Sequence, residues 1–193
     1  MHRTRPRSSC RRTGRAIAAL IALALAAVAV VALVRFDAVD RFRERVAPQP
    51  SPGCVADDPT GDGCLTPAAL ALHDRAVAEF GDRLRGTTCW SAHEWNPSSD
   101  HPQGRACDFF PTRAGTFPEG AELDTGWAVA KWLRDHAEEL DVRYVIWQGR
   151  IWYRSAFFAD EDGWGRPYNG GGVYDPSDAT GGHFDHVHVS VRR

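Results

Sequence analysis

Two short segments that carry histidine and aspartate constrain this chain more than any other feature. The first reads HPQGRACD at residues 101–108, and the second reads HFDHVH at residues 183–188. Each lies beside a run of apolar residues typical of a strand. Residues two apart on a strand point to the same face, so His186 and His188 are expected to project together. If Asp108 lies on a neighbouring strand, the two segments meet on one face of a sheet.

These residue types are the ones that a zinc site uses. Zinc takes neutral imidazole and carboxylate ligands in a tetrahedral arrangement, and a catalytic zinc keeps one position for water. The histidines of the second segment, together with Asp108 and His101, can supply three protein ligands and leave that position open. Gly104 permits a tight backbone turn between His101 and Asp108.

The pattern HxxGxAxD followed by a late HxH resembles the zinc peptidase superfamily of D-alanyl-D-alanine carboxypeptidases, lysostaphin-type endopeptidases and the hedgehog fold. The segments HFDHVHVS and VIWQGRIW are similar to a carboxypeptidase-like domain of exported actinobacterial proteins. The resemblance covers about residues 65–191. It implies Zn²⁺ bound by His101, Asp108 and His188, and hydrolysis of peptidoglycan peptide, as D-Ala-D-Ala carboxypeptidase or endopeptidase.

The resemblance also implies three catalytic residues. His186 occupies the position that aids proton transfer, Asp185 the position of a general-base Glu, and His183 a position where murein endopeptidases carry a histidine. A regular strand over 185–188 would turn Asp185 away from both histidines. Asp185 is therefore the base only if the strand begins at or after it. Otherwise His186 is the base and Asp185 orients a ring.

One feature of the carboxypeptidase branch is missing. That branch places an Arg before the first motif, where it polarises the scissile carbonyl, but residues 87–100 contain no Arg. The resemblance leaves His93 or a more distant Arg for this role. Trp95 and Trp164 stand in polar or Gly-rich loops, where they are candidates to line a substrate cleft.

The N-terminus predicts a membrane segment. Six Arg residues precede an uncharged run over 16–34, whose 19 residues span roughly 28 Å as a helix. Positive charge stays cytoplasmic, so the body should lie outside. An anchor is favoured over a cleaved signal ending near residues 27–29, which would make the protein secreted. The expected parts are a basic tail (1–15), a single transmembrane signal-anchor (16–34), a juxtamembrane segment and linker (35–63) and a zinc peptidase-like domain (64–193).

Charge excludes one class of partner, and the cysteines agree with an extracytoplasmic body. Residues 36–193 hold 16 basic and 25 acidic residues, and this net charge of −9 argues against nucleic acid as a partner. Four cysteines follow the predicted anchor, an even set that suits two disulfides in an oxidising compartment. Proximity in sequence favours Cys54–Cys64 and Cys89–Cys107, and the other two connectivities stay open. The sequence contains no CxxC pair, so nothing indicates that these cysteines bind zinc.

The remaining pattern predicts an α+β domain with a mostly antiparallel sheet. One helix is expected over 67–80, capped by Thr66 and burying Leu70, Val77 and Phe80, and a second over about 124–140. Strands are expected near 84–90, 105–110 and 186–191, with a hairpin of 142–147 and 150–154. The alternative function is a non-catalytic cell-wall-binding or interaction module on the same fold. The sequence indicates no particular oligomeric state.

Overall fold

The computed structural model describes residues 53–96, 98–154 and 164–192. Contacts divide the chain after Ala47, and the described residues all belong to the second unit, Pro48–Arg193. The predicted basic tail and membrane segment, residues 1–34, lie outside the described residues. Within the described ranges, no helix is both long enough and apolar enough to span a bilayer.

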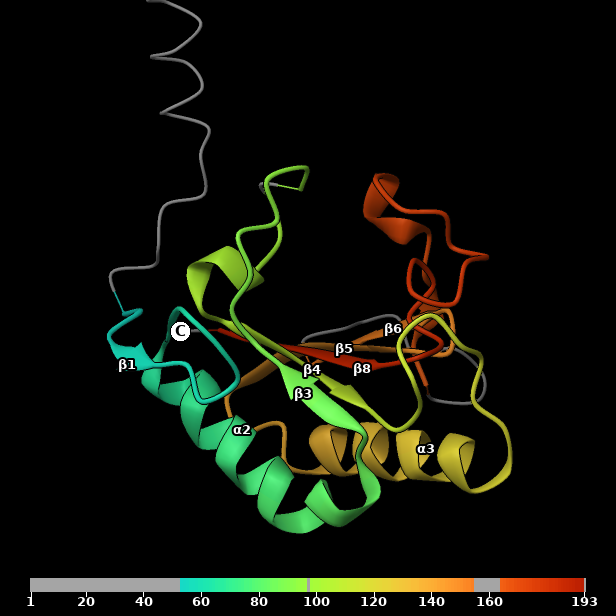
Figure 1. Ribbon diagram of the computed structural model, residues 1–193, viewed down its shortest axis with the longest axis horizontal. Helices are drawn as coiled ribbons and strands as arrows, with labels where there is room; N and C mark the ends of the chain where they lie inside the picture. The colour runs from blue at the N-terminus through green and yellow to red at the C-terminus, as the bar shows by residue number, and fades with distance from the viewer. Residues whose placement is uncertain (1–52, 97, 155–163, 193) are drawn as a thin grey trace, which may run out of the picture. The chain divides into compact units, whose positions relative to one another are not determined.

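A six-stranded antiparallel sheet, with strand order β3-β4-β8-β5-β6-β7, forms the centre of the domain. Both helices cover one face of this sheet, and the loops before β4 and before β8 rise from the other face (Figure 1). An additional two-stranded sheet pairs β1 with β2. The predicted α+β class is confirmed. The strands are β1 (Ala56–Asp57), β2 (Cys64–Leu65), β3 (Gly86–Thr88), β4 (Ala106–Phe110), β5 (Val142–Trp147), β6 (Arg150–Tyr153), β7 (Arg166–Pro167) and β8 (Val187–Val191), and the helices are α2 (Pro67–Phe80) and α3 (Gly120–Asp135).

The hydrophobic core lies between the helices and the sheet. Alternation along β8 places Val187, Val189 and Val191 in this core, whereas His188 points to the opposite face. On β4, Phe109 likewise belongs to the core. Burial of these apolar side chains contributes about 25 cal/mol per Å². The core therefore fixes the strands whose opposite face carries the polar residues.

Helix α2 matches the predicted bounds but not all of the predicted burial. Thr66 Oγ1 accepts a hydrogen bond from the Ala69 N–H at 3.3 Å, as expected of an N-cap. The buried stripe runs through Ala69, Leu72, Ala76 and Phe80. The predicted burial of Val77 is wrong, because this residue follows the stripe by one position and so turns about 100° towards solvent.

Helix α3 begins at Gly120 and ends at Asp135, four residues earlier at its start and five earlier at its end than predicted. At its C-terminal end, the Trp132 carbonyl oxygen accepts the His136 N–H at 3.0 Å and also lies 2.8 Å from His136 Nδ1, whereas the next N–H, that of Ala137, bonds to the Arg134 carbonyl at 3.2 Å. Residues 136–140 continue as turns rather than as helix. The backbone hydrogen bonds therefore change from the i−4 to the i−3 pattern at Ala137, inside a stretch of continuous helical periodicity.

The predicted hairpin is confirmed, with β5 and β6 joined by Gln148 and Gly149. Both residues have positive φ (50° and 66°), the signature of a type I′ turn, whose twist matches that of paired strands. At the other end of β5, a register shift between Val142 and Tyr144 marks a bulge beside the pairing with β8.

Two disulfides join the predicted partners, Cys54 with Cys64 and Cys89 with Cys107. The second links the residue that follows β3 to the middle of β4. Each closes a short loop, and the lower chain entropy of the unfolded state stabilises the fold by roughly 3 kcal/mol per disulfide.

Residues in the predicted linker also pack on the domain, since Asp58 Oδ2 accepts the Trp90 N–H at 2.7 Å.

Candidate metal centre

The sheet itself pairs two of the predicted metal ligands. Asp108 on β4 and His188 on β8 are direct partners in the antiparallel ladder, and residues so paired share a face. His188 Nδ1 lies 2.9 Å from Asp108 Oδ1. Both side chains are largely buried on the face of the sheet away from the helices.

The third predicted ligand comes from the short 3₁₀ helix η2 (His101–Gln103) that precedes β4. Gly104 ends this helix with φ of 64°, and a Cβ there would collide with the Cys64 carbonyl and Cys54 Sγ. Only glycine fits this turn. The turn places His101 Nε2 at 3.3 Å from Asp108 Oδ2 and 3.2 Å from His188 Nδ1.

The ligand atoms of His101, Asp108 and His188 all lie within 4.8 Å of one another, so the group can hold one metal ion. Hydrogen bonds on the far side of each ring suit this use. His101 Nδ1 faces the Cys89 carbonyl oxygen, and His188 Nε2 lies 3.1 Å from Ser190 Oγ. When these nitrogens carry the protons, His101 Nε2 and His188 Nδ1 keep free lone pairs for a metal.

The electrostatics of the group favour a bound cation. Burial raises the pKa of Asp108, but the nearby His101 and His186 outweigh it and hold the pKa well below its usual range. Burial also lowers the pKa of His101, yet the Asp108 carboxylate reverses this and leaves it raised. For His188, burial prevails and lowers the pKa. A buried carboxylate beside two imidazoles therefore attracts a proton or a cation.

A second pair, Asp185 and His186, precedes β8, which begins only at Val187. Asp185 is fully buried and its Oδ1 lies 2.5 Å from His186 Nδ1. Its Oδ2 accepts the Gly115 N–H at 2.6 Å and the Thr180 hydroxyl at 2.7 Å. His186 Nε2 lies 3.8 Å from Asp108 Oδ1. Both carboxylate oxygens of Asp185 thus face protein donors, while His186 faces the ligand group.

His183, the third predicted catalytic residue, lies in the same cluster. Its backbone has φ of 57°, a left-handed conformation that is uncommon for a residue with a side chain and recurs at functional sites. The ring centroid lies 4.5 Å from that of His186 and 5.5 Å from that of His188. Burial lowers its pKa well below the ordinary value, so the ring is neutral.

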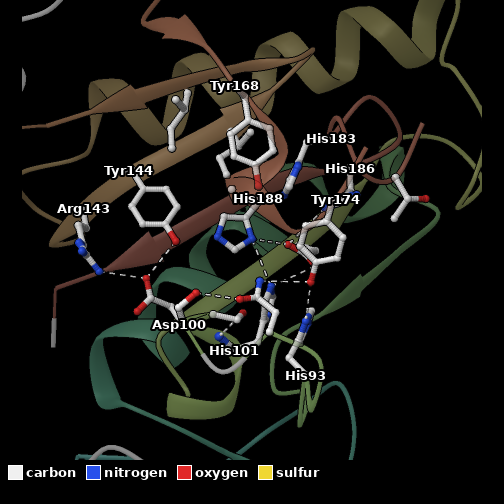
Figure 2. A pocket seen from close by; sticks show the side chains of 18 of the residues that line it. His93, Asp100, His101, Arg143, Tyr144, Tyr168, Tyr174, His183, His186 and His188 are labelled. Atoms are coloured by element: carbon white, nitrogen blue, oxygen red, sulfur yellow. Dashed lines mark hydrogen bonds and ion pairs between the residues drawn. The ribbon is translucent and has the colours of Figure 1, made fainter. Parts of the chain in front are cut away.

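The three candidate ligands line a cavity of about 390 Å³ together with His183 and His186, whereas Asp185 lies buried behind His186 (Figure 2). All four tyrosines of the chain line it, namely Tyr144, Tyr153, Tyr168 and Tyr174. Arg143 is the one arginine among its lining residues in the described ranges. Asp100, directly before His101, binds this arginine. Arg143 Nη1 lies 3.2 Å from Asp100 Oδ2, and the Tyr144 hydroxyl donates to the same oxygen at 3.0 Å. Arg105 Nη2 donates to the other oxygen of Asp100, Oδ1, at 2.5 Å.

The rim of the cavity is formed by two loops that meet at the Tyr174 hydroxyl. This oxygen accepts the Trp95 Nε1–H at 3.2 Å and the Asn96 Nδ2–H at 3.3 Å, and lies 3.2 Å from His93 Nδ1. Burial, followed by the charge of His101, lowers the pKa of His93 to about 4. Trp95 therefore lines the cavity as expected. Trp164 does not, because it is buried against Trp127 in the core.

Several residues of the cavity carried no signal in the sequence. Asp100, Arg143, Tyr168 and Thr180 come from four separate segments, and no motif links them. The position of Asp100 beside a predicted ligand was the one hint available. The bulge in β5 that lies next to Arg143 is a tertiary feature that strand periodicity does not reveal.

Residues 61–182 match the family model described as VldE, C-terminal domain. The chain belongs to this family. The VldE C-terminal domain match covers more than half of the chain and includes His101 and Asp108, and it ends one residue before His183. Searches of curated proteins and of solved structures found no match. The resemblance to D-alanyl-D-alanine carboxypeptidases stays a prediction.

Proposed function

We propose that this protein is a zinc-dependent peptidase that hydrolyses peptidoglycan peptide, of the D-alanyl-D-alanine carboxypeptidase-like class. The observation that carries the proposal is the juxtaposition of two groups in one cavity. The His101, Asp108 and His188 group can hold a metal ion, and the Asp185–His186 pair lies beside it, with His186 Nε2 3.8 Å from Asp108 Oδ1. Metallopeptidases need both a metal and an adjacent proton carrier.

Zinc is the metal proposed because the donors fit it. Two imidazole nitrogens and one carboxylate oxygen are zinc ligands of the catalytic kind, with the fourth position left for water. When bound, zinc lowers the pKa of a water molecule and polarises a carbonyl group. The surrounding hydrogen bonds of His101 to Cys89 and of His188 to Ser190 are those that orient ligating histidines.

Within this proposal, His186 moves the proton. It takes a proton from the attacking water and delivers it to the leaving amine, while a C–O bond forms and the C–N bond breaks. Asp185 orients the ring and stabilises its protonated form through the 2.5 Å contact with Nδ1. Burial lowers the pKa of His186, but Asp108 and Asp185 outweigh burial and raise it. Asp185 is not assigned as the base, since both its oxygens already accept protein hydrogen bonds.

The choice of substrate combines compartment and cavity. Two disulfides suit an oxidising, extracytoplasmic compartment, which is where peptidoglycan lies. The predicted membrane segment would hold the domain near that polymer. A cavity of about 390 Å³ suits a few residues of a peptide, and its tyrosines offer both apolar contact and hydrogen bonds.

The test is a metal and activity assay on the full chain, purified without chelators from an oxidising compartment. We expect about one zinc per chain by elemental analysis. We also expect cleavage of D-Ala-ending stem peptides or of cross-linked muropeptides, read by mass spectrometry. His188→Ala should lose zinc and cleavage, whereas His186→Ala should lose cleavage and keep zinc. Zinc binding without cleavage of any peptidoglycan fragment would favour the wall-binding module, and a folded chain that takes up no zinc would overturn the proposal.

A further inference from the structure

The hydroxyl of Tyr168 differs from two of its neighbours in the cavity. The Tyr144 hydroxyl donates to Asp100 at 3.0 Å, and the Tyr174 hydroxyl is held by Trp95 and Asn96. Within the described part of the chain, the Tyr168 hydroxyl has no hydrogen-bond partner, although the residue is partly buried. A polar group held in a cavity without a partner is a candidate to bind a ligand.

The ring of Tyr168 is held firmly. Its backbone N–H donates to the Gly149 carbonyl at 2.8 Å, directly after β7. The ring packs edge to face on His183, with centroids 4.9 Å apart and planes at 88°. His183 packs in turn on His186. This chain of contacts positions the ring relative to the metal group before any substrate enters.

The hydroxyl is also uncovered on the side of the cavity. A Cβ added to Gly171 would lie 3.4 Å from the Tyr168 oxygen, so the glycine at this place leaves the oxygen accessible. In Figure 2 the hydroxyl points towards the ring of His188. Burial, followed by the nearby Tyr174 and Tyr153, raises the pKa of Tyr168 to about 12. The phenol therefore keeps its proton at neutral pH and acts as a donor.

Peptide hydrolysis needs such a donor, because negative charge develops on the carbonyl oxygen as water attacks. Two other candidates at the cavity, Arg143 and His93, are engaged. Arg143 is bound by Asp100 at 3.2 Å, and His93 is neutral with its Nδ1 beside the Tyr174 hydroxyl.

We propose that the Tyr168 hydroxyl donates a hydrogen bond to the oxygen of the scissile carbonyl and stabilises the charge that develops there. This inference rests on the proposed peptidase function. In the reaction, the water oxygen bonds to the carbonyl carbon, the C–N bond breaks, and His186 passes the proton from water to the amine. Tyr168 keeps its own proton throughout and supplies only the hydrogen bond.

Tyr168→Phe in the full, zinc-loaded chain tests the inference. Removal of one such donor lowers kcat by about 100-fold or more, and KM should change by less than about threefold. Zinc content and melting temperature should match the wild type, because the ring that packs on His183 is retained. Tyr153→Phe is the matched comparison. Tyr153 also lines the cavity, but its ring packs on Tyr144 rather than on His183, so loss of its hydroxyl should act on KM rather than on kcat.

A binding measurement separates this inference from activity. A phosphinate analogue of D-alanyl-D-alanine mimics the charged oxygen of the transition state, and Tyr168→Phe should weaken its binding by about 100-fold. Binding of the reaction product D-alanine should be unchanged. A kcat and a phosphinate affinity within threefold of wild type would overturn the inference, as would loss of zinc from the variant. If the wild-type chain neither binds zinc nor cleaves peptide, the proposed function itself fails.

Discussion

The two halves of the cavity are built in different ways. In the ligand half, Asp108 and His188 stand on paired strands, and His101 is held by a turn next to both disulfides. The other half, residues 164–182, contains one two-residue strand and a run of glycines with positive φ. Metal ligands need fixed geometry, which strands provide. Substrate contacts can be placed on loops that a rigid scaffold positions.

The proposed proton carrier lies where these halves meet. His186 directly precedes β8, but its partner Asp185 is held by Thr180 from the glycine-rich half and by Gly115 from the loop after β4. The Ala179 carbonyl also accepts the N–H groups of Phe184 and Asp185, at 2.8 and 3.2 Å. The comparison therefore predicts that the two halves respond differently to mutation. Changes in the ligand half should act on metal affinity, and changes in the loop half should act on turnover.

The largest effect is expected from His188→Ala. This change removes a ligand that the sheet places opposite Asp108, so zinc affinity should fall by well over 100-fold. Competition with a chromophoric chelator measures the affinity. His136→Ala is the control, since this histidine caps α3 away from the cavity and should leave zinc binding intact. Equal zinc affinity in the two variants would show that the ligand half is wrongly assigned.

The next largest effect is expected where the two halves of the cavity meet, at Asp185 and His186. Asp185→Asn keeps the shape of the side chain but loses the charge that holds the His186 ring, so kcat should fall by about 100-fold. Zinc affinity should change by less than about tenfold, because Asp185 contacts none of the three ligands. Steady-state kinetics and chelator competition give both values. A variant that loses zinc as fully as His188→Ala would break the distinction between the halves.

A smaller effect is expected from pH. Because Asp108 raises the pKa of His101 above its ordinary value near 6.5, a metal must displace a proton from His101 at pH values below this raised pKa. Zinc affinity should therefore rise with pH by about tenfold per unit for the one proton released, and level off above that pKa. Asp108 and His188 add no proton, since the pKa of each is lowered. Titrations at pH 6, 7 and 8 measure the slope, and a flat profile would contradict the assignment of His101.

The smallest effect on the metal is expected from the double change Cys54→Ser and Cys64→Ser. Loss of this disulfide should lower the free energy of unfolding by about 3 kcal/mol. Zinc affinity should stay within about tenfold of wild type, because neither cysteine contacts a ligand. Denaturant unfolding and chelator competition measure the two quantities. The paired variant Cys89→Ser and Cys107→Ser sharpens the comparison, since the Cys89 carbonyl faces His101 and zinc affinity should fall further there.

Local chemistry in the sequence predicted much of the domain. The turn residues Gln148 and Gly149, the cap at Thr66 and the pairing of the four cysteines each depend on neighbours in the chain, and all three are confirmed. Periodicity predicted both helices but not the ends of α3, because the hydrogen-bond pattern changes at Ala137 while the periodicity of apolar residues continues. The predicted membrane segment and domain divisions stay predictions.

The resemblance of two sequence motifs to the zinc peptidase superfamily predicted that His101, Asp108 and His188 meet, and the ligand atoms of these residues lie within 4.8 Å of one another. What surrounds them depends on the tertiary structure. The strand β8 begins after His186, which leaves Asp185 bound to Gly115 and Thr180. Tyr168 reaches the cavity from a loop separated from both motifs. Such contacts depend on how distant loops pack, and no local rule of spacing encodes that packing.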